Sequence, residues 1–406
     1  MAACLFSSTT LKAQTTRRLT QEQAIAEGIK NNNRIKAASY EADLQNALKS
    51  SATNIPKTEF LYSQGQINSS SSDNSIGVTQ KIEFPTVYRY QGQLAAARVT
   101  ASRRQVDLTQ FELTQNIKLA INDWIYQLTR RQLLLRQDSL FGNLAKASTL
   151  RYKTGESNQL EKVTSETQLL EVKNRLAQVN ADITIAKQRL QTLLNTKDDI
   201  TLADTLLVKR EFTLPADSNA VAANPYLAYL QQQIVVNKAD TKVQQARRLP
   251  DLIVGYYNQS FRGVQTFNGV TEKYTGSDRF HVVQAGIAIP ILPGGNKGKI
   301  AAAKINEQVA DANLQYQQMN LQGQFMELVQ QYNKYKSALD YYEQSALPQA
   351  DLIIKNAEKG FKSGDIAYLQ YLQSLAMAVK IRSDYTDNLY WYNQTIIEIE
   401  NITGKK

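Results

Sequence analysis

Few residues of this sequence belong to the types that carry out catalysis or bind metals. The 406 residues include one histidine, His281, and one cysteine, Cys4. A Cys/His metal cluster and a Ser-His-Asp or Cys-His catalytic site would need more of these residues. His281 lies in an alternating stretch that begins at Phe280, a pattern typical of an ordinary strand residue. We therefore expect no enzymatic activity, no bound metal and no cofactor.

A segment with two adjacent glycines does not change this expectation. Gly294, Gly295 and Lys297 lack the spacing of a phosphate-binding loop. The segment ILPGGNKG, residues 291–298, is instead predicted to be a strand end followed by a turn.

One motif occurs twice, and its residues are those of a turn between helices. The sequence YKTGESNQLEKV begins at Tyr152 and FKSGDIAYLQYL begins at Phe361, an offset of 209 residues. Glycine reverses a chain most easily at a helix C-terminus, and the Ser, Asn or Asp that follows is a type that caps the next helix. Each copy is therefore predicted to be the tip of a helical hairpin. The tip residues are Tyr152, Lys153, Thr154, Gly155, Glu156 and Ser157 in the first copy and Phe361, Lys362, Ser363, Gly364 and Asp365 in the second.

Long helical patterns flank both tips. Apolar residues recur at spacings of three, four or seven from Ile117 to Leu135, from Leu169 to Leu193 and from Leu321 to Tyr342. The chain holds only 18 Gly and 8 Pro, which is few for a loop-rich globular protein. We therefore predict a mainly helical protein whose long helices pack against one another as coiled coils.

Two segments change from the helical period to a period of two. Within residues 56–84, Ile76, Val78 and Ile82 alternate with polar or small residues. Residues 250–292 show the same alternation. Each segment is predicted to be a β-hairpin with one apolar and one polar face. The loops at 68–75 and 263–277 are expected to face the outside of the cell.

The order of these patterns predicts two sequence repeats with a leader and a connector. Residues 1–16 are interpreted as a signal-peptide remnant, 17–197 as the first repeat with its tip at 152–158, 198–223 as the connector, and 224–406 as the second repeat with its tip at 361–367. Each repeat is a helix, a β-hairpin and a long helical hairpin.

The net charge of +10 does not indicate a nucleic-acid partner. Three arginine pairs, which begin at Arg103, Arg130 and Arg247, are scattered within helical patterns. Neither an RNA-binding aromatic signature nor a zinc-finger spacing is present. We therefore expect no binding to nucleic acid.

The strands predict association with a membrane and with other copies of the chain. Four strands leave two open sheet edges, whereas four strands from each of three chains would close a barrel of twelve. Strands of roughly 10 to 14 residues are long enough to cross a bilayer when tilted. No run of about 18 apolar residues occurs, so the membrane prediction depends on the strands alone.

The ordered features resemble the TolC-like family of outer membrane efflux channels. The resemblance extends from about Leu19 to Gly404 and includes the Asn224-Pro225 opening, the strand exits QKIEFP and AIPILPGG, and the two tips. It implies a homotrimer with a transmembrane β-barrel of twelve strands in the outer membrane lipid and a helical tunnel in the periplasm. It also implies a periplasmic adaptor and an inner membrane transporter as partners, and an exit channel of a tripartite efflux pump as the function. The segment EFPTVYRYQ, residues 83–91, is most similar to that of family members that work with heavy-metal pumps of the resistance-nodulation-division type.

The resemblance also implies roles for the tips and for an aperture beyond them. The tip residues would dock the adaptor and pump. In the family, carboxylates one and two turns beyond the second tip line a closed aperture; Gln370 and Gln373 occupy these positions here, and Glu161 and Thr164 occupy the equivalent positions of the first hairpin. Glu161 would give an acidic ring around a trimer axis, or else be an exposed helix residue paired with Lys162 or Lys153.

Other function classes fit parts of the sequence. An elongated soluble coiled-coil scaffold would explain the helices but not the alternating strands, and a type I secretion exit duct would share the whole architecture. An exported enzyme would need a catalytic site that the sequence lacks. The transported substrate does not follow from the sequence, because a passive tunnel receives its cargo from the pump that feeds it.

Overall fold

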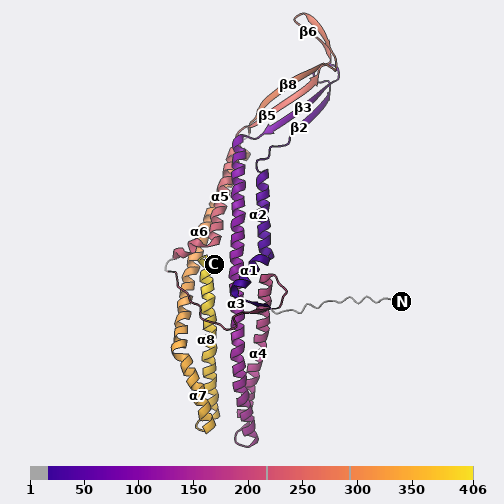
Figure 1. Cartoon of the computed structure of the whole chain (residues 1–406). Helices are drawn as coiled ribbons and strands as arrows, with labels where there is room; N and C mark the ends of the chain where they lie inside the picture. Colours follow the sequence, from indigo (N-terminus) through magenta and orange to yellow (C-terminus); the bar gives the residue numbers. More distant parts are fainter. Residues whose placement is uncertain (1–16, 216–217, 292–293, 406) are drawn as a thin grey trace, which may run out of the picture. The chain divides into compact units, whose positions relative to one another are not determined.

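The computed structural model describes residues 17–215, 218–291 and 294–405, and Figure 1 labels its helices and strands. Two compact units are present, and each takes residues from both halves of the chain. The first lies within Met1–Ala37, Asp107–Pro225 and Gln318–Lys406, and the second within Ala38–Val106 and Tyr226–Gln317. The predicted signal-peptide remnant, residues 1–16, lies outside the described residues.

Long helices of the first unit form two hairpins, as the heptad spacing predicts. Helices α3 (Pro85–Lys153) and α4 (Gln159–Leu194) meet at the first tip, and α7 (Leu347–Ser363) and α8 (Tyr368–Ile402) meet at the second (Figure 1). The buried coiled-coil positions of α4 are Val172, Val179, Ala186 and Leu190.

A hydrophobic cluster joins the two hairpins to each other. Leu134 and Phe141 of α3 and Val179 of α4 pack in this cluster with Leu372 and Leu375 of α8. Burying each of these side chains contributes about 1.5 to 3 kcal/mol to the free energy of unfolding. The tips are therefore positioned by a core that both hairpins share.

The N-terminal helix begins at a capping box and ends within a run of asparagines. In α1 (Gln21–Asn31), Gln23 N–H donates to the Thr20 hydroxyl at 3.2 Å, and Thr20 N–H donates to the Gln23 side chain at 3.0 Å. Asn32 has extended backbone angles, so α2 (Asn33–Ser51) starts as a separate helix. The run of three asparagines, residues 31–33, thus interrupts the helical segment.

The second hairpin has two features that its heptad pattern does not predict. Helix α6 (Gly294–Tyr341) continues into a π-helix (Tyr342–Ala346) before α7, and the wider turn shifts the helical spacing. Helix α6 also starts at Gly294, so residues 294–298 are helical and do not belong to the predicted turn. Glycine is tolerated there because the first N–H groups of a helix have no partner within it.

A short parallel sheet ties the start of the chain to the connector. Strand β1 (Arg17–Leu19) pairs with β4 (Ile200–Leu202), and Leu19 and Ile200 are buried. Arg17 also forms an ion pair with Glu27 at 2.6 Å. The prediction of a plain connector over 198–223 therefore misses a strand that is part of the core of the first unit.

The rest of the connector is held to α8 by one buried asparagine. Asn393, which is 2% exposed, accepts from Arg210 N–H at 3.1 Å and donates to the Val208 carbonyl at 2.8 Å. Lys209 between them forms ion pairs with Glu343 at 2.9 Å and Asp340 at 3.4 Å. Asn393 thus supplies the connector with the two backbone hydrogen bonds that a neighbouring strand would make.

Replacing Asn393 by alanine should release the connector. The substitution removes both partners of the Val208 and Arg210 backbone groups, and we expect a loss of about 2 kcal/mol in stability. Asn388→Ala is the matched control, because among the described residues the Asn388 side chain bonds within its own helix, to the Asp384 carbonyl. The measurement is protease cleavage within residues 204–215 of the purified protein, and equal cleavage of both variants would contradict the expectation.

The second unit contains a four-stranded antiparallel sheet in the order β2-β3-β5-β8 (Figure 1). Strands β2 (Glu59–Gly65) and β3 (Asp73–Ile82) are the first hairpin, and β5 (Asp251–Ser260) and β8 (Arg279–Ala288) belong to the second. Helix α5 (Pro225–Ala246) precedes β5 and begins at the predicted Asn-Pro step. The strands that the alternation predicts are thus present, and β2 and β8 are the edges of this sheet.

The two faces of this sheet differ in chemistry. Directly paired residues of antiparallel strands lie on the same face of the sheet. One row across the four strands is Phe60, Val78, Tyr256 and Val283. The neighbouring row, on the opposite face, is Glu59, Thr79, Gly255 and Gln284. The apolar face, which holds the first row, also includes Tyr62, Ile76, Val254 and Ile287; the polar face, which holds the second row, also includes Ser75, Gly77, Lys81 and Asp251. Val283 is 82% and Phe60 is 76% exposed, and Lys81 forms an ion pair with Asp251 at 2.9 Å.

The predicted loop at 263–277 contains its own hairpin. Strands β6 (Gly263–Phe267) and β7 (Val270–Tyr274) pair around Asn268 and Gly269, both with positive φ. The sequence analysis misses this hairpin, although Asn-Gly between two alternating segments is itself the signal of a hairpin turn. His281 lies in β8, as its alternating surroundings predict.

Among the described helices, none has a stretch that is both apolar enough and long enough to span a membrane.

Candidate docking site at the hairpin tips

The first tip is a tight turn with the conformation that its glycine requires. Helix α3 ends at Lys153, and Gly155 has φ +79°. Asn158 caps α4 by accepting from Glu161 N–H at 2.9 Å. Positive φ is costly for residues with a side chain, so glycine is favoured at this position.

The second tip repeats the backbone of the first but not its cap. Glu156 N–H donates to the Arg151 carbonyl at 2.8 Å, and Asp365 N–H donates to the Gly360 carbonyl at the same distance. Gly364 has φ +83°. The offset of 209 residues thus relates the same hydrogen bonds in both tips.

The cap predicted for the second tip is wrong. Ala367 is the N-cap of α8 and provides no side-chain hydrogen bond. Asp365 instead accepts from the Ser363 hydroxyl at 2.6 Å, within the turn itself. Because the acid is used to close the turn, it is not available to cap the helix.

Most of the polar tip residues are exposed. Lys153, Thr154, Gly155 and Glu156 are exposed in the first tip, as are Lys362, Ser363, Gly364 and Asp365 in the second. Ser157 is half-buried, and its hydroxyl has no hydrogen-bond partner among the described residues. The exposed side chains of both tips are free to contact a partner.

The two aromatic residues that begin the motif have different surroundings. Tyr152 is 40% exposed, and its ring contacts the ammonium group of Lys162 at 5.5 Å. Phe361 stacks on Tyr371 with ring centroids 4.6 Å apart, and Arg151 of the first hairpin lies 5.4 Å from its ring centroid. Phe361 therefore packs between the hairpins, whereas Tyr152 is a surface residue.

Phe361→Ala should loosen the second tip, and Tyr152→Ala should not. Truncating the stacked ring of Phe361 removes its contacts with Tyr371 and Arg151 and should cost about 2 to 3 kcal/mol, whereas truncating the exposed Tyr152 should cost less than about 1 kcal/mol. Hydrogen exchange of the α7 and α8 amides next to the tip would measure the difference. Equal exchange in the two variants would mean that the stacking does not stabilise the tip.

The interpretation of Glu161 as an exposed helix residue paired with Lys162 or Lys153 is wrong. Its side chain is 12% exposed and forms an ion pair with Arg151 at 3.3 Å. Arg151 precedes the motif, and its counterpart in the second copy is Gly360, so the repeat gives no signal for this ion pair.

The other predicted aperture residues lie on the two return helices. Thr164 is half-buried on α4, and Gln370 and Gln373 are exposed on α8. Tyr368, which the sequence analysis misses, is half-buried on α8; this burial raises the pKa of its phenol, and the charge of Glu161 raises it further. Its spacing of three from Tyr371, on one helix face, is the signal that could have identified it.

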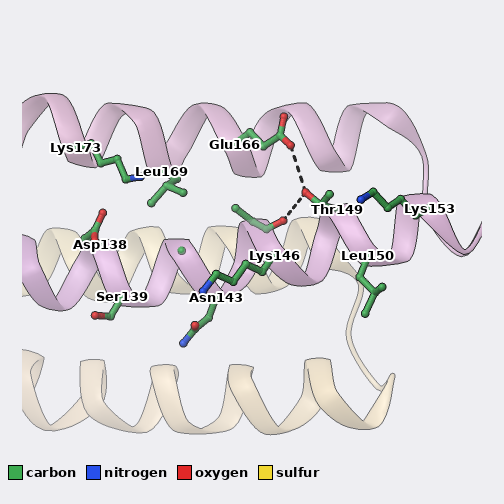
Figure 2. A pocket seen from close by; sticks show the side chains of 12 residues that line it. Asp138, Ser139, Asn143, Lys146, Thr149, Leu150, Lys153, Glu166, Leu169 and Lys173 are labelled. Atoms are coloured by element: carbon green, nitrogen blue, oxygen red, sulfur yellow. Dashed lines mark hydrogen bonds between the residues drawn. The ribbon is translucent and has the colours of Figure 1, made fainter.

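A groove between α3 and α4 lies beside the first tip (Figure 2). Its volume is about 870 Å³. The Thr149 hydroxyl donates to the Ala145 carbonyl of its own helix at 2.8 Å. It also lies 3.3 Å from the Glu166 carboxylate of α4 and so connects the two walls of the groove. Lys146, Lys153 and Lys173 line the groove without an ion pair among the described residues. The groove and the exposed first tip form one continuous candidate surface for a partner protein, because Lys153 belongs to both.

No group of three or more His, Cys, Asp or Glu residues in the described part of the chain is arranged to hold a metal ion.

Comparison with solved structures identifies the fold. The chain is similar to CusC, with 14% identity and a TM-score of 0.77 over 98% of this chain and 96% of that one. It is similar to the CmeC outer membrane channel of Campylobacter jejuni, with 13% identity and a TM-score of 0.77 over 100% and 93% of the two chains. For the MtrE outer membrane channel of Neisseria gonorrhoeae, the identity is 14% and the TM-score is 0.74 over 95% and 88%. The fold is thus that of outer membrane channels.

The sequence itself matches a family over its second half. Residues 217–405 match the model of the family described as outer membrane efflux protein. The second half of the chain is thus similar to this family. No curated protein matches the sequence significantly.

Proposed function

We propose that three copies of the chain form the outer membrane exit channel of a tripartite efflux pump. The observation that carries the proposal is the sheet of the second unit, which has an exposed apolar face, a polar face and two open edges. An apolar face of this kind suits lipid, and a polar face with a charged pair suits a water-filled lumen. Pairing β8 of one copy with β2 of the next would leave no free edge.

The channel is passive, and its cargo is supplied by an inner membrane transporter. Substrates enter from the periplasm through the helical hairpins of the three copies and leave through a barrel of twelve strands. The loop between β2 and β3 and the β6–β7 hairpin lie at the end of the sheet that is not joined to the helices, which supports their exposure outside the cell. Glu161, Thr164, Gln370 and Gln373 would then line the periplasmic aperture.

The tips and the adjacent groove are the proposed contact with a periplasmic adaptor. The exposed polar residues of both tips support this role, because burial between helices does not account for them. The groove beside the first tip adds a concave surface large enough for side chains of an adaptor helix. Occupation by such a helix would place the adaptor against both α3 and α4.

The molar mass of the purified protein in detergent tests this proposal. We expect three chains of 45.6 kDa and migration as a heat-modifiable trimer. A monomer or a dimer would contradict the closure of the barrel. Cross-linking from a probe at Lys153 should capture an adaptor together with its inner membrane transporter, and capture of a type I secretion transporter would assign the channel to protein export instead.

A further inference from the structure

A polar cluster lies on the apolar face of the sheet at its loop end. The guanidinium group of Arg279 donates to the side-chain oxygens of Asn258 and Asn74, and also to the Asn258 carbonyl at 2.9 Å. The register places Asn74, Asn258 and Arg279 on the same face as Ile76, Tyr256 and Val283. A cation is thus held at the loop end of the apolar face, where polar residues replace the apolar ones of the middle of the strands.

The hydrogen bonds orient Arg279 without using all of its donors. A guanidinium has five N–H groups, and these three hydrogen bonds leave two of them. Arg279 forms no ion pair with a carboxylate in the part of the chain that the structure describes. Its positive charge is therefore available to an anion from outside the chain.

His281 adds a second donor to the cluster. Tyr256 Oη lies 2.5 Å from His281 Nδ1, and Asn258 Nδ2 lies 3.4 Å from the same nitrogen. An amide nitrogen can only donate, so Nδ1 accepts and the proton of the neutral ring is on Nε2. His281 is exposed, and its Nε2–H has no partner among the described residues.

We propose that Arg279 and His281 bind the phosphate group of a membrane lipid. This inference rests on the proposed function, because it requires the apolar face to contact lipid. Acyl chains would lie along Tyr256, Val283 and Ile287, and the phosphate would meet the two donors at the end of that face. Arginine binds phosphate through paired N–H groups, and the low polarity of the neighbouring face strengthens such a contact. With the loop end outside the cell, the lipid belongs to the outer leaflet.

Native mass spectrometry of the detergent-purified protein with diphosphoryl lipid A tests the site. We expect bound lipid on the intact protein, and binding at least about tenfold weaker for Arg279→Gln, which corresponds to 1.4 kcal/mol. His281→Leu leaves the asparagine contacts of Arg279 in place and should weaken binding several-fold. Lys273→Gln is the matched control, because Lys273 is an exposed cation of β7 that is not on the apolar face.

Several outcomes would overturn the assignment. Equal binding of lipid A without phosphates, or full binding by both Arg279→Gln and His281→Leu, would show that the cluster does not recognise phosphate. Displacement of the lipid by millimolar inorganic phosphate would assign the site to the free ion. The same spectra report the number of chains: a wild-type monomer contradicts the proposed function, whereas an intact trimer with no phosphate preference contradicts only this inference.

Discussion

Val283→Arg should remove the protein from the outer membrane, and the same substitution at the next residue should not. Val283 lies on the apolar face and is 82% exposed, so its replacement would place three arginines of a trimer against lipid. Each arginine at the middle of the bilayer costs about 2 to 4 kcal/mol on the lipid side of a barrel. The amount of heat-modifiable trimer in the outer membrane fraction is the measurement.

Gln284→Arg is the matched control for this prediction. Gln284 follows Val283 in β8 and lies on the polar face, in the row of Thr79 and Gly255. An arginine there would face water, so the trimer should reach the membrane in normal amount. If Gln284→Arg fails to insert and Val283→Arg succeeds, the assignment of the two faces is reversed; if both insert equally, the sheet does not face lipid.

Gly364→Val should stop export while the trimer still inserts. Gly364 has φ +83°, and a Cβ atom at this position would meet no atom within 4 Å. The cost of valine is therefore backbone strain rather than a clash, about 1 to 2 kcal/mol. This strain is too small to unfold the helices, but its relief would change the turn that carries the exposed residues of the second tip. Substrate export and cross-linking to the adaptor should both be lost.

Asparagine at the same position separates the turn from the side chain. Asparagine adopts positive φ far more readily than valine does, so Gly364→Asn should keep the turn and the export activity. The level of trimer in the outer membrane is measured for both variants. Normal export by Gly364→Val at a normal trimer level would mean that the second tip is only a turn and that the docking contact lies elsewhere.

The sequence predicts those parts of the fold that depend on local periodicity. The alternation around Ile76 and Val78 gives the strands and their two faces, and the heptads give the long helices, because both patterns are determined by neighbouring residues. Strands β1 and β4 could not be found in this way. Each is three residues long and is stabilised by a partner about 180 residues away, so neither has a periodic pattern of its own.

The same distinction between local patterns and long-range packing explains which features of the candidate docking site the sequence predicts. The glycines of the tips follow from their motif, because a helical hairpin needs positive φ at one defined position. The ion pair of Arg151 with Glu161 and the stacking of Phe361 on Tyr371 depend on how helices pack, which the spacing of a single helix does not determine. The second copy has glycine where the first has Arg151, so the internal repeat also fails to reveal the ion pair.

The division into two compact units has a consequence for how the protein is made. Each unit combines segments from the first and second halves of the chain, so the second unit cannot be completed before Gln317 is made, nor the first before the C-terminal helix α8 is made. A fragment that ends at residue 197 would lack α8 and leave the shared hairpin core exposed. If the chain is exported as the proposed function requires, its first half must remain unfolded, and protected from aggregation, until most of the second half has crossed the inner membrane.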